Sequence, residues 1–265
     1  GSGIAGMSFA LKVAHKGKVA LVCKSGLEEA NTYFAQGGVA SVTNLLVDNF
    51  EKHIEDTMIA GDWISDRTAV EKVVREAPAQ IQELISWGVN FDKNEKGEFD
   101  LHREGGHSEF RILHHKDNTG AEIQDSLIRA VQQHPNITVI ENHFAIEILT
   151  QHHLGVTVTR QTPDIKCYGA YILDPKTGKV DTYLAKVTLM ATGGVGAVYQ
   201  TTSNRRRHCH GISGKRNRKR YGIRTIPPDS ALPSGRSSFF PHYRGDEGIR
   251  WCTSYHGRER VHAEI

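Results

Sequence analysis

The chain has 265 residues, of which 38% are hydrophobic and 24% are charged, and its formal net charge is +3. This composition is typical of a globular protein with one substantial core or two smaller ones. The sequence contains no run of 18 apolar residues, which excludes a helix that spans a membrane, and no signal peptide is recognisable. The four cysteines form no Cys-x-x-Cys pair, which favours a reduced, cytoplasmic protein.

The first predicted elements are a glycine-rich turn, a helix and a strand. Gly1, Gly3 and Gly6 form the pattern G-x-G-x-x-G. Residues 4–15 then show helical spacing, and residues 18–23 form a short apolar run typical of a buried strand. This order corresponds to the last two thirds of a β-α-β unit, so we expect the first strand to lie just before Gly1.

The glycine spacing fits either a nucleotide-binding turn or a plain glycine-rich turn, and the helix and strand that follow it, with the second glycine turn at Gly193-Gly194, favour the nucleotide-binding turn. In such a turn the first glycine permits the tight bend, the second lets the backbone approach a pyrophosphate, and the third lets helix and strand pack closely. The N-terminus of the helix offers free N–H groups and its positive dipole end to the phosphates. An NAD site also needs an acidic residue about 20 residues further on. That place reads Val22-Cys23-Lys24, so a standard NAD site is not expected.

The remaining elements up to Asn204 alternate between helical and strand patterns. Helices are predicted at residues 48–61, 66–88 and 120–133. A turn at residues 174–178 joins two of the predicted strands, which cover residues 137–140, 144–150, 154–160, 167–173 and 181–190. The last strand runs into a second glycine turn, Ala191-Thr192-Gly193-Gly194, which suits close approach to a ligand.

The charge of the chain changes sharply after Asn204. Residues 1–204 carry 19 basic and 25 acidic side chains, whereas residues 205–265 carry 14 basic and 5 acidic ones. No helical or strand period continues in this tail, and its main features are the basic runs at residues 205–207 and 215–220. One interpretation is a nucleic-acid patch, because Lys and Arg bind phosphates.

Several motifs within residues 1–204 resemble a known family. The stretch Glu29–Ala40, which reads EANTYFAQGGVA, resembles the flavin-binding segment of the fumarate reductase/succinate dehydrogenase flavoprotein superfamily. Within that superfamily the chain is similar to the L-aspartate oxidase family. The further motifs that carry the similarity are REGGHS at 103–108, Arg111-Ile112, DNTG at 117–120, ATGGVGAVYQTTSN at 191–204, and His53, Asp56, Thr57, Ala60 and Gly61.

Two positions discriminate within the superfamily. Succinate dehydrogenases carry a histidine that bonds covalently to FAD where this chain has Asn31, and an amide cannot form that bond, so noncovalent FAD is expected. Those enzymes also carry phenylalanine at the position of Glu104. A carboxylate there suits a substrate with an ammonium group, which favours aspartate over succinate. A fumarate reductase or succinate dehydrogenase flavoprotein is the alternative enzyme, and without the resemblance Glu104 reads as a solvated loop acid.

The resemblance implies an α/β fold with a Rossmann-like FAD-binding domain. It also implies hydride transfer from L-aspartate to FAD, which gives iminoaspartate for NAD synthesis through quinolinate. Oxygen or fumarate would accept the electrons, and quinolinate synthase is a possible partner; no nucleic acid, membrane or metal is expected. By position, the residues expected to bind FAD are Gly1, Ser2, Gly3, Ile4, Ala5, Gly6, Lys24, Asn31, Thr32, Tyr33, Phe34, Ala35, Gln36, Gly37, Gly38, Phe144 and Ala145, with Thr192–Gly194 as a further candidate.

A frameshift accounts for the tail. If Arg205–His208 are back-translated and one nucleotide is dropped, the new frame reads Gly-Asp-Gly and continues with a long family-like run that includes the motif His-Pro-Thr-Ala-Leu. We therefore expect residues 1–204 to be a partial FAD-binding domain that is truncated at both ends, and residues 205–265 to be an out-of-frame, disordered tail. The catalytic histidine and arginine residues of the family are then not retained, so this chain is expected to be inactive.

Smaller features are interpreted as structural. The pairs His114-His115 and His152-His153 have no carboxylate or thiol at metal-ligand spacing, and surface or capping roles are expected for them. Cys23, at the end of a predicted strand, is expected to be a small core residue.

Overall fold

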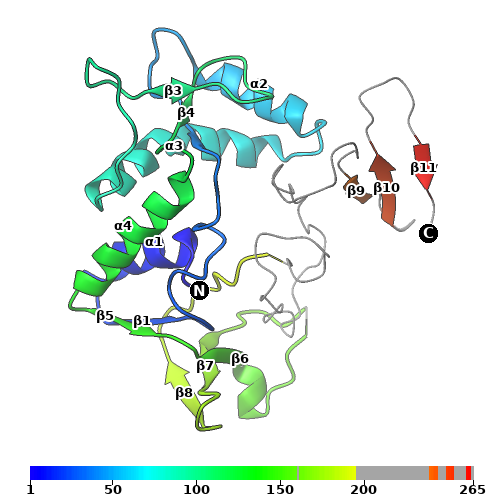
Figure 1. Cartoon of the computed structure of the whole chain (residues 1–265). Coiled ribbons are helices and arrows are strands. Elements are labelled where there is room, and N and C mark those ends of the chain that lie inside the picture. The colour runs from blue at the N-terminus through cyan, green and yellow to red at the C-terminus, as the bar shows by residue number, and fades with distance from the viewer. Residues whose placement is uncertain (160, 195–238, 244–248, 254–260, 264–265) are drawn as a thin grey trace. The chain divides into compact units, whose positions relative to one another are not determined.

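The structure is a computed structural model that describes residues 1–159 and 161–194, together with three strands between residues 239 and 263 (Figure 1). The chain divides into two compact units. The first comprises Gly1–Thr150 and Lys166–Gly193, and the second comprises Gln151–Ile165 and Gly194–Ile265. The first unit holds nearly all the residues that the sequence analysis singled out.

The glycine-rich turn leads into a β-α unit, as its sequence predicts. Helix α1 (Ile4–Val13) follows the turn, and strand β1 (Val19–Val22) follows the helix. Strand β1 pairs in parallel with β5 (Ile137–Ile140), which follows helix α4 (Thr119–Gln133). The α/β fold class is thereby confirmed. Helices α1 and α4 lie side by side over this sheet (Figure 1). The main core joins residues of α1, β1, α3, β4 and α4 and consists of Met7, Leu21, Cys23, Leu27, Ile81, Leu84, Val89, Phe91, Leu113, Ile123, Leu127 and Val131.

Two further helices form where predicted. Helix α2 (Phe50–Ala60) begins at Asn49, whose side chain accepts a hydrogen bond from the Lys52 N–H. Helix α3 (Arg67–Ser86) begins at Asp66, whose carboxylate accepts from Thr68 and Ala69. Both are N-cap interactions that satisfy otherwise free N–H groups. The two helices pack through a small apolar cluster of Ile54, Met58 and Val74.

A small antiparallel sheet joins two motifs that are distant in sequence. Its order is β2 (Val39–Ala40), β4 (Ile112–Leu113), β3 (Leu101–His102). A Cβ atom on Gly38 would lie 2.3 Å from Ile112 Cγ2, so only glycine permits this close approach. The sheet therefore holds the flavin-like segment 31–38 beside the REGGHS loop at 103–108.

A second antiparallel sheet follows β5 in the chain. It contains β6 (Phe144–Thr150), β7 (Cys167–Leu173) and β8 (Val180–Leu184), with β7 in the middle. The turn between β7 and β8 is stabilised by Asp174, whose carboxylate accepts from the Lys176 N–H and the Thr177 hydroxyl. The hairpin that the sequence predicts at this turn is confirmed.

Two predicted strands are wrong in part. The 3-10 helix η1 (Gln151–Leu154) begins before the strand expected at 154–160, and residues 155–159 are not in a strand. The strand expected at 181–190 ends at Leu184, so Val187–Met190 does not form part of a β-sheet. A strand needs hydrogen bonds to a neighbouring strand, and an apolar pattern does not reveal whether a neighbour exists. Leu154 and Val187 are both 70% exposed, so neither segment buries its apolar side chains.

The described strands of the second unit form an antiparallel sheet of β9 (Phe239–Tyr243), β10 (Ile249–Thr253) and β11 (Val261–Ala263), with β10 in the middle. Apart from these strands, the tail expected to be disordered lies outside the described residues, as do both basic runs. Among the described helices, none is both long enough and apolar enough to cross a membrane.

Candidate functional site

The glycine-rich turn is packed so tightly that two of its glycines have no room for a side chain. A Cβ atom on Gly6 would lie 1.9 Å from the carbonyl oxygen of Gly1. One on Gly1 would lie 2.0 Å from the carbonyl oxygen of Ala191, in the second glycine turn. The two glycine-rich turns therefore contact each other through their backbones, although one opens the chain and the other follows β8. Thr192–Gly194, which continue the second turn, are exposed.

Gly3 differs from Gly1 and Gly6 because a Cβ atom at this position would make only ordinary contacts. The nearest atom to a Cβ on Gly3 would be Thr32 Oγ1, at 3.4 Å. Gly3 is the N-cap of α1 but makes no side-chain cap, and the first turn of the helix holds no acidic residue. The N–H of Ile4 donates to Thr32 Oγ1 at 3.0 Å. This helix terminus keeps the positive dipole end that favours an anion such as a phosphate.

The backbone carbonyl of Ser2 accepts a hydrogen bond from a buried side-chain amide. Gln124, on α4, is fully buried, and its Nε2 donates to the carbonyl oxygens of Ser2 at 2.8 Å and of Leu27 at 2.6 Å. A buried side-chain amide that bridges two backbone carbonyls fixes both segments. The backbone of the turn is therefore preorganised by contacts within the protein.

Segment 31–38 lies against the start of α4. The N–H of Gly120 donates to Ala35 O at 2.9 Å, and a Cβ on Gly120 would lie 2.0 Å from Thr32 O. Gly120, the last residue of the DNTG motif at 117–120, therefore lets the backbone of α4 lie directly against segment 31–38. Residues 33–37 are all exposed, and the rings of Tyr33 and Phe34 meet edge to face, with centroids 5.4 Å apart.

Asn31 carries an acceptor with no partner. Its Oδ1 is buried and accepts no hydrogen bond from the described part of the protein. Leaving such a group unsatisfied costs about 1–3 kcal/mol, so an unpartnered buried amide in a segment that resembles a cofactor site indicates a missing donor. The site residues thus include a polar group that a bound cofactor would satisfy.

The other predicted cofactor residues follow the carboxyl ends of β1 and β5. The N–H of Cys23 donates to Ile140 O at 2.9 Å, and the N–H of His143 donates to Cys23 O at 3.0 Å. Lys24 and the start of β6, with Phe144 and Ala145, therefore continue from neighbouring segments at one edge of the sheet. Ligands of α/β sheets bind at this edge. Cys23 is a buried core residue, as predicted, and burial raises the pKa of its thiol to about 11.

Glu104 lies beside the flavin-like segment. It is exposed, and its Oε1 lies 3.6 Å from the position that a Cβ on Gly37 would occupy. The structure therefore brings together two residues that sequence analysis selected from different motifs. An exposed carboxylate at this place has room to meet a cationic group of a ligand.

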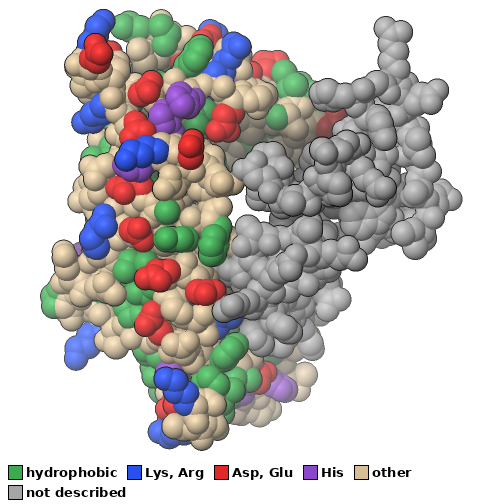
Figure 2. Space-filling view, in the orientation of Figure 1, with side chains coloured by type: hydrophobic (Ala, Val, Ile, Leu, Met, Phe, Trp, Pro, Cys, Tyr) green, Lys and Arg blue, Asp and Glu red, His purple; other side chains and the backbone are tan. Residues whose placement is uncertain are grey.

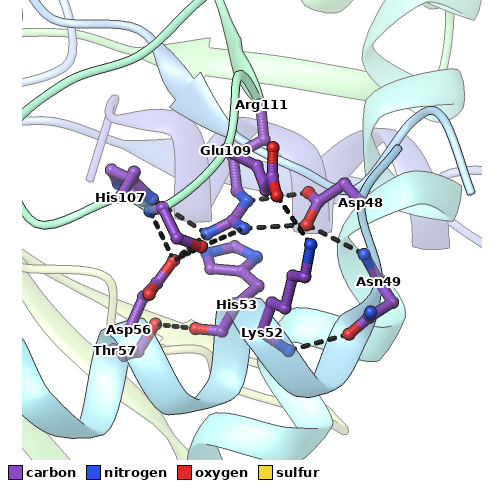
Figure 3. Close-up of polar contacts among 10 residues, drawn as sticks. Asp48, Asn49, Lys52, His53, Asp56, Thr57, His107, Glu109 and Arg111 are labelled. Atoms are coloured by element: carbon purple, nitrogen blue, oxygen red, sulfur yellow. Dashed lines mark hydrogen bonds and ion pairs between the residues drawn. The ribbon is translucent and has the colours of Figure 1, made fainter.

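The REGGHS loop is anchored by a buried arginine (Figure 3). Arg111, which is fully buried, donates from Nε and Nη2 to the two carboxylate oxygens of Asp48, each at 2.8 Å. Its Nη1 donates to Asp56 on α2 at 2.5 Å. Asp56 in turn accepts from the N–H and the hydroxyl of Ser108, both at 2.8 Å. This network ties the end of the loop to α2.

The network also fixes the charges of its members. Burial acts to lower the pKa of Arg111, but hydrogen bonds to Asp48 and Asp56 outweigh it and raise that pKa above the ordinary value. Burial acts to raise the pKa of Asp56, but hydrogen bonds from Ser108 and Arg111 lower it overall. His53 faces the same guanidinium, and burial followed by the charge of Arg111 lowers its pKa to about 4. At neutral pH the network therefore holds the Arg111 cation, the Asp56 carboxylate and a neutral His53.

Sequence analysis missed Asp48 and the structural role of Arg111. Arg111 was named only as part of a motif, and Asp48 carried no signal because 63 positions separate it from its partner. In the sequence, the only indication of this ion pair is that an acidic and a basic residue occur in two distant segments. The surface role expected for His114 is wrong, because this side chain is 8% exposed and lies beside Asp92 and Asp100. His152 and His153 are in η1, which contains no buried residue.

The visible surface carries charges of both signs. Figure 2 shows acidic and basic side chains interspersed over the described part of one face, with no continuous basic area there. The basic runs that suggested a nucleic-acid patch lie outside the described residues. The described surface on this face therefore gives no support to that alternative.

Comparisons with known proteins agree with the motifs. The pattern of the family described as "FAD binding domain" matches residues 1–219, which passes the boundary expected at residue 204. The chain is 45% identical over 204 residues to L-aspartate oxidase 2-b, chloroplastic, of Nicotiana tabacum, with 77% of this chain and 30% of that protein covered. It is 43% identical over 209 residues to L-aspartate oxidase of Vibrio cholerae, with 77% and 38% covered. The chain spans about a third of the length of these relatives.

Solved structures show the same fold. A point mutant of the E. coli quinol fumarate reductase FrdA superposes with a TM-score of 0.65 at 29% identity, over 75% of this chain and 32% of that one. Mycobacterium smegmatis Sdh1 in complex with UQ1 superposes with a TM-score of 0.66 at 28% identity, over 77% and 34%. The open glycine-rich turn, segment 31–38 and Asn31 lie in a fold that these flavoproteins share.

Proposed function

The chain belongs to the FAD-binding domain family, and we propose that it derives from an L-aspartate oxidase, an enzyme that converts L-aspartate to iminoaspartate. The observation that carries the substrate assignment is the position of Glu104 beside Gly37. When bound, FAD accepts the hydride that leaves the substrate. Oxygen or fumarate then takes up the electrons, and the product feeds NAD synthesis through quinolinate. Contact with quinolinate synthase and a cytoplasmic location belong to this proposal, although plant relatives are named chloroplastic.

The residues of the first unit fit FAD. The backbone of Ser2–Ala5, at the open N-terminus of α1, is proposed to hold the diphosphate. Segment 31–38, Lys24, Phe144 and Ala145 are proposed to line the rest of the cofactor. Asn31 supplies an acceptor that lacks a partner within the described part of the protein. Because an amide forms no covalent bond to the flavin, the binding is proposed to be noncovalent.

Glu104 is proposed to bind the ammonium group of the substrate. The carboxylate is exposed at the edge of the flavin-like segment, and an ammonium–carboxylate hydrogen bond is stronger than a neutral one. Succinate has no such group, so Glu104 favours the aspartate oxidase over the succinate dehydrogenase alternative. The Arg111–Asp56–Ser108 contacts then position the loop that carries Glu104.

The chain itself is proposed to be inactive. The charge balance reverses after Asn204, and we infer that the family-like sequence continues in another reading frame. The tail at 205–265 would then supply none of the catalytic residues expected there. The proposed domain is therefore residues 1–204.

Two experiments test this proposal. Sequencing of the coding DNA across Thr202–Arg207 shows whether one frame continues. A chain with the frame restored and extended to the length of its relatives is expected to form peroxide with L-aspartate. Glu104→Gln in that chain is expected to lower kcat/KM for aspartate roughly 10–100-fold, the effect of losing a hydrogen bond to a charged group. Equal loss with a substrate that lacks the ammonium group would contradict the role of Glu104.

A further inference from the structure

A second cluster of polar side chains lies at the small sheet, outside the network around Arg111. Asp100 comes directly before β3, His102 ends β3, and His114 comes directly after β4. Because Leu101 pairs with Leu113 in this antiparallel ladder, Asp100 and His114 meet at the next position across the strands. One ligand atom of each of Asp100, His102 and His114 lies within 4.8 Å of the other two.

His114 has the environment of a ligand without its ion. The side chain is more than nine-tenths buried, and neither ring nitrogen makes a hydrogen bond to the described residues. Its Nε2 faces Asp100, whose Oδ2 lies 3.9 Å away. Buried polar groups in native proteins are almost always satisfied, so an unpaired imidazole aimed at a carboxylate calls for an occupant.

The other ring nitrogen of His114 faces a supporting carboxylate. Nδ1 lies 3.3 Å from Asp92 Oδ2, a distance that a small rotation of the ring converts into a hydrogen bond. Asp92 is fixed by the N–H of Lys116, which donates to it at 2.6 Å. A ligating histidine commonly donates its second N–H to a carboxylate in this way, which orients the ring and leaves Nε2 free for the metal.

His102 completes the set from the solvent side. Its ring stacks on that of His114, with centroids 3.7 Å apart and an angle of 23° between the planes. Bonds of about 2.0–2.2 Å to a tetrahedral ion bring ligand atoms to about 3.4 Å from one another. A metal ion lies in the plane of each imidazole that binds it, so the ring of His102 has to rotate out of the stack to become a ligand. His102 and Asp100 are exposed, which leaves both side chains room for that rotation.

We propose that Asp100, His102 and His114 bind one divalent transition-metal ion, with water at the fourth position. Two imidazole nitrogens, one carboxylate oxygen and a water form a ligand set that Zn²⁺ takes in tetrahedral sites. Asp92 is a positioning residue that acts through His114. The site lies two residues before Glu104 in the chain, so a bound ion fixes the start of the loop that carries Glu104.

A titration of the 265-residue chain with Co²⁺ tests the site, after treatment with a chelator and without added FAD. The expected result is visible absorption of a tetrahedral ion that saturates at one equivalent and is displaced by Zn²⁺. His102→Gln and Asp100→Asn are exposed substitutions that leave the core intact, and each is expected to weaken binding by at least about 10-fold.

Asp92→Asn is expected to weaken binding by roughly 10–100-fold while the stoichiometry stays at one. The control is His152→Gln, which alters a histidine of the other unit, and it is expected to leave the affinity unchanged. Absence of the tetrahedral spectrum in the unaltered chain would overturn the proposal, as would unchanged affinity in His102→Gln and Asp100→Asn.

Discussion

Arg111 and Asp48 form a buried, two-pronged ion pair, with Nε and Nη2 each 2.8 Å from one carboxylate oxygen. Their side chains are 1% and 2% exposed. A buried ion pair adds little to the stability of the fold compared with apolar residues of similar volume. Removing one partner is nevertheless costly, because the other charge is left buried and unpaired. The pair therefore matters for the fold through the cost of breaking it.

Arg111→Ala is expected to lower the free energy of unfolding by about 3–5 kcal/mol, because it leaves Asp48 and Asp56 without their cation. Urea denaturation followed by circular dichroism measures the change. The matched control is Arg67→Ala, which removes an exposed pair with Glu71 at i,i+4 spacing. That change is expected to cost less than about 1 kcal/mol, and equal effects of the two substitutions would contradict the role of the buried pair.

His53 is expected to make stability depend on pH. Its pKa is about 4 in the folded protein against an ordinary value of 6.5, so the unfolded chain binds its proton more readily. The contribution is present in full above pH 6.5 and is lost as the pH falls from 6.5 to 4, with a total of about 3 kcal/mol. The same region holds His107, Asp48, Asp56 and the Arg111 cation.

Denaturation curves at several pH values between 7 and 4 test this. In His53→Gln the slope of stability against pH over this window is expected to fall, since glutamine does not titrate. His15→Gln, which alters an exposed histidine, is expected to keep the slope. A slope that persists in His53→Gln would assign the effect to other groups.

Gly3→Ala is expected to weaken FAD binding without changing the stability of the fold. A Cβ at this position has room within the protein, and φ is −78°, a value that alanine adopts. Stability is therefore expected to stay within about 0.5 kcal/mol, whereas FAD affinity is expected to fall at least about 10-fold because the methyl group occupies the path of the diphosphate. Fluorescence titration with FAD measures the affinity, and Gly17→Ala, with open space around it, serves as the control. Full affinity in Gly3→Ala would place the diphosphate elsewhere.

Asn31→Ala is expected to have opposite effects with and without FAD. Without the cofactor, removal of an unsatisfied buried acceptor is expected to be neutral or stabilising. With the cofactor, the loss of a hydrogen bond is expected to reduce the stabilisation that FAD provides. Thermal melts at fixed FAD concentration measure both, and a variant that is destabilised equally in both conditions would show that Asn31 has only a structural role.

Local patterns predicted the helices well because their signals lie within a few residues. Asn49 and Asp66 cap α2 and α3 as their side chains suggest, and the glycine turn opens α1. Val187–Met190 was predicted as a strand but is not in one, since pairing depends on a partner that the local sequence does not identify.

The sequence predicted those site residues that belong to a recognisable motif. It did not predict those whose role depends on partners far away in the chain. Glu104 and segment 31–38 came from motifs, and the structure places Glu104 beside Gly37. Asp48 and the environment of His114 were not foreseen, because their partners come from other elements of the fold. His114 lies beside two carboxylates because of the way in which β3 pairs with β4. The sequence of either strand alone does not specify that pairing.

We propose that residues 1–204 bind FAD without a covalent bond. The most direct test is to incubate the purified chain with FAD, remove free cofactor by gel filtration, and then denature the protein. We expect about one flavin per chain before denaturation and its complete release afterwards. A folded chain that retains no flavin, or flavin that stays attached to the denatured chain, would contradict noncovalent FAD binding.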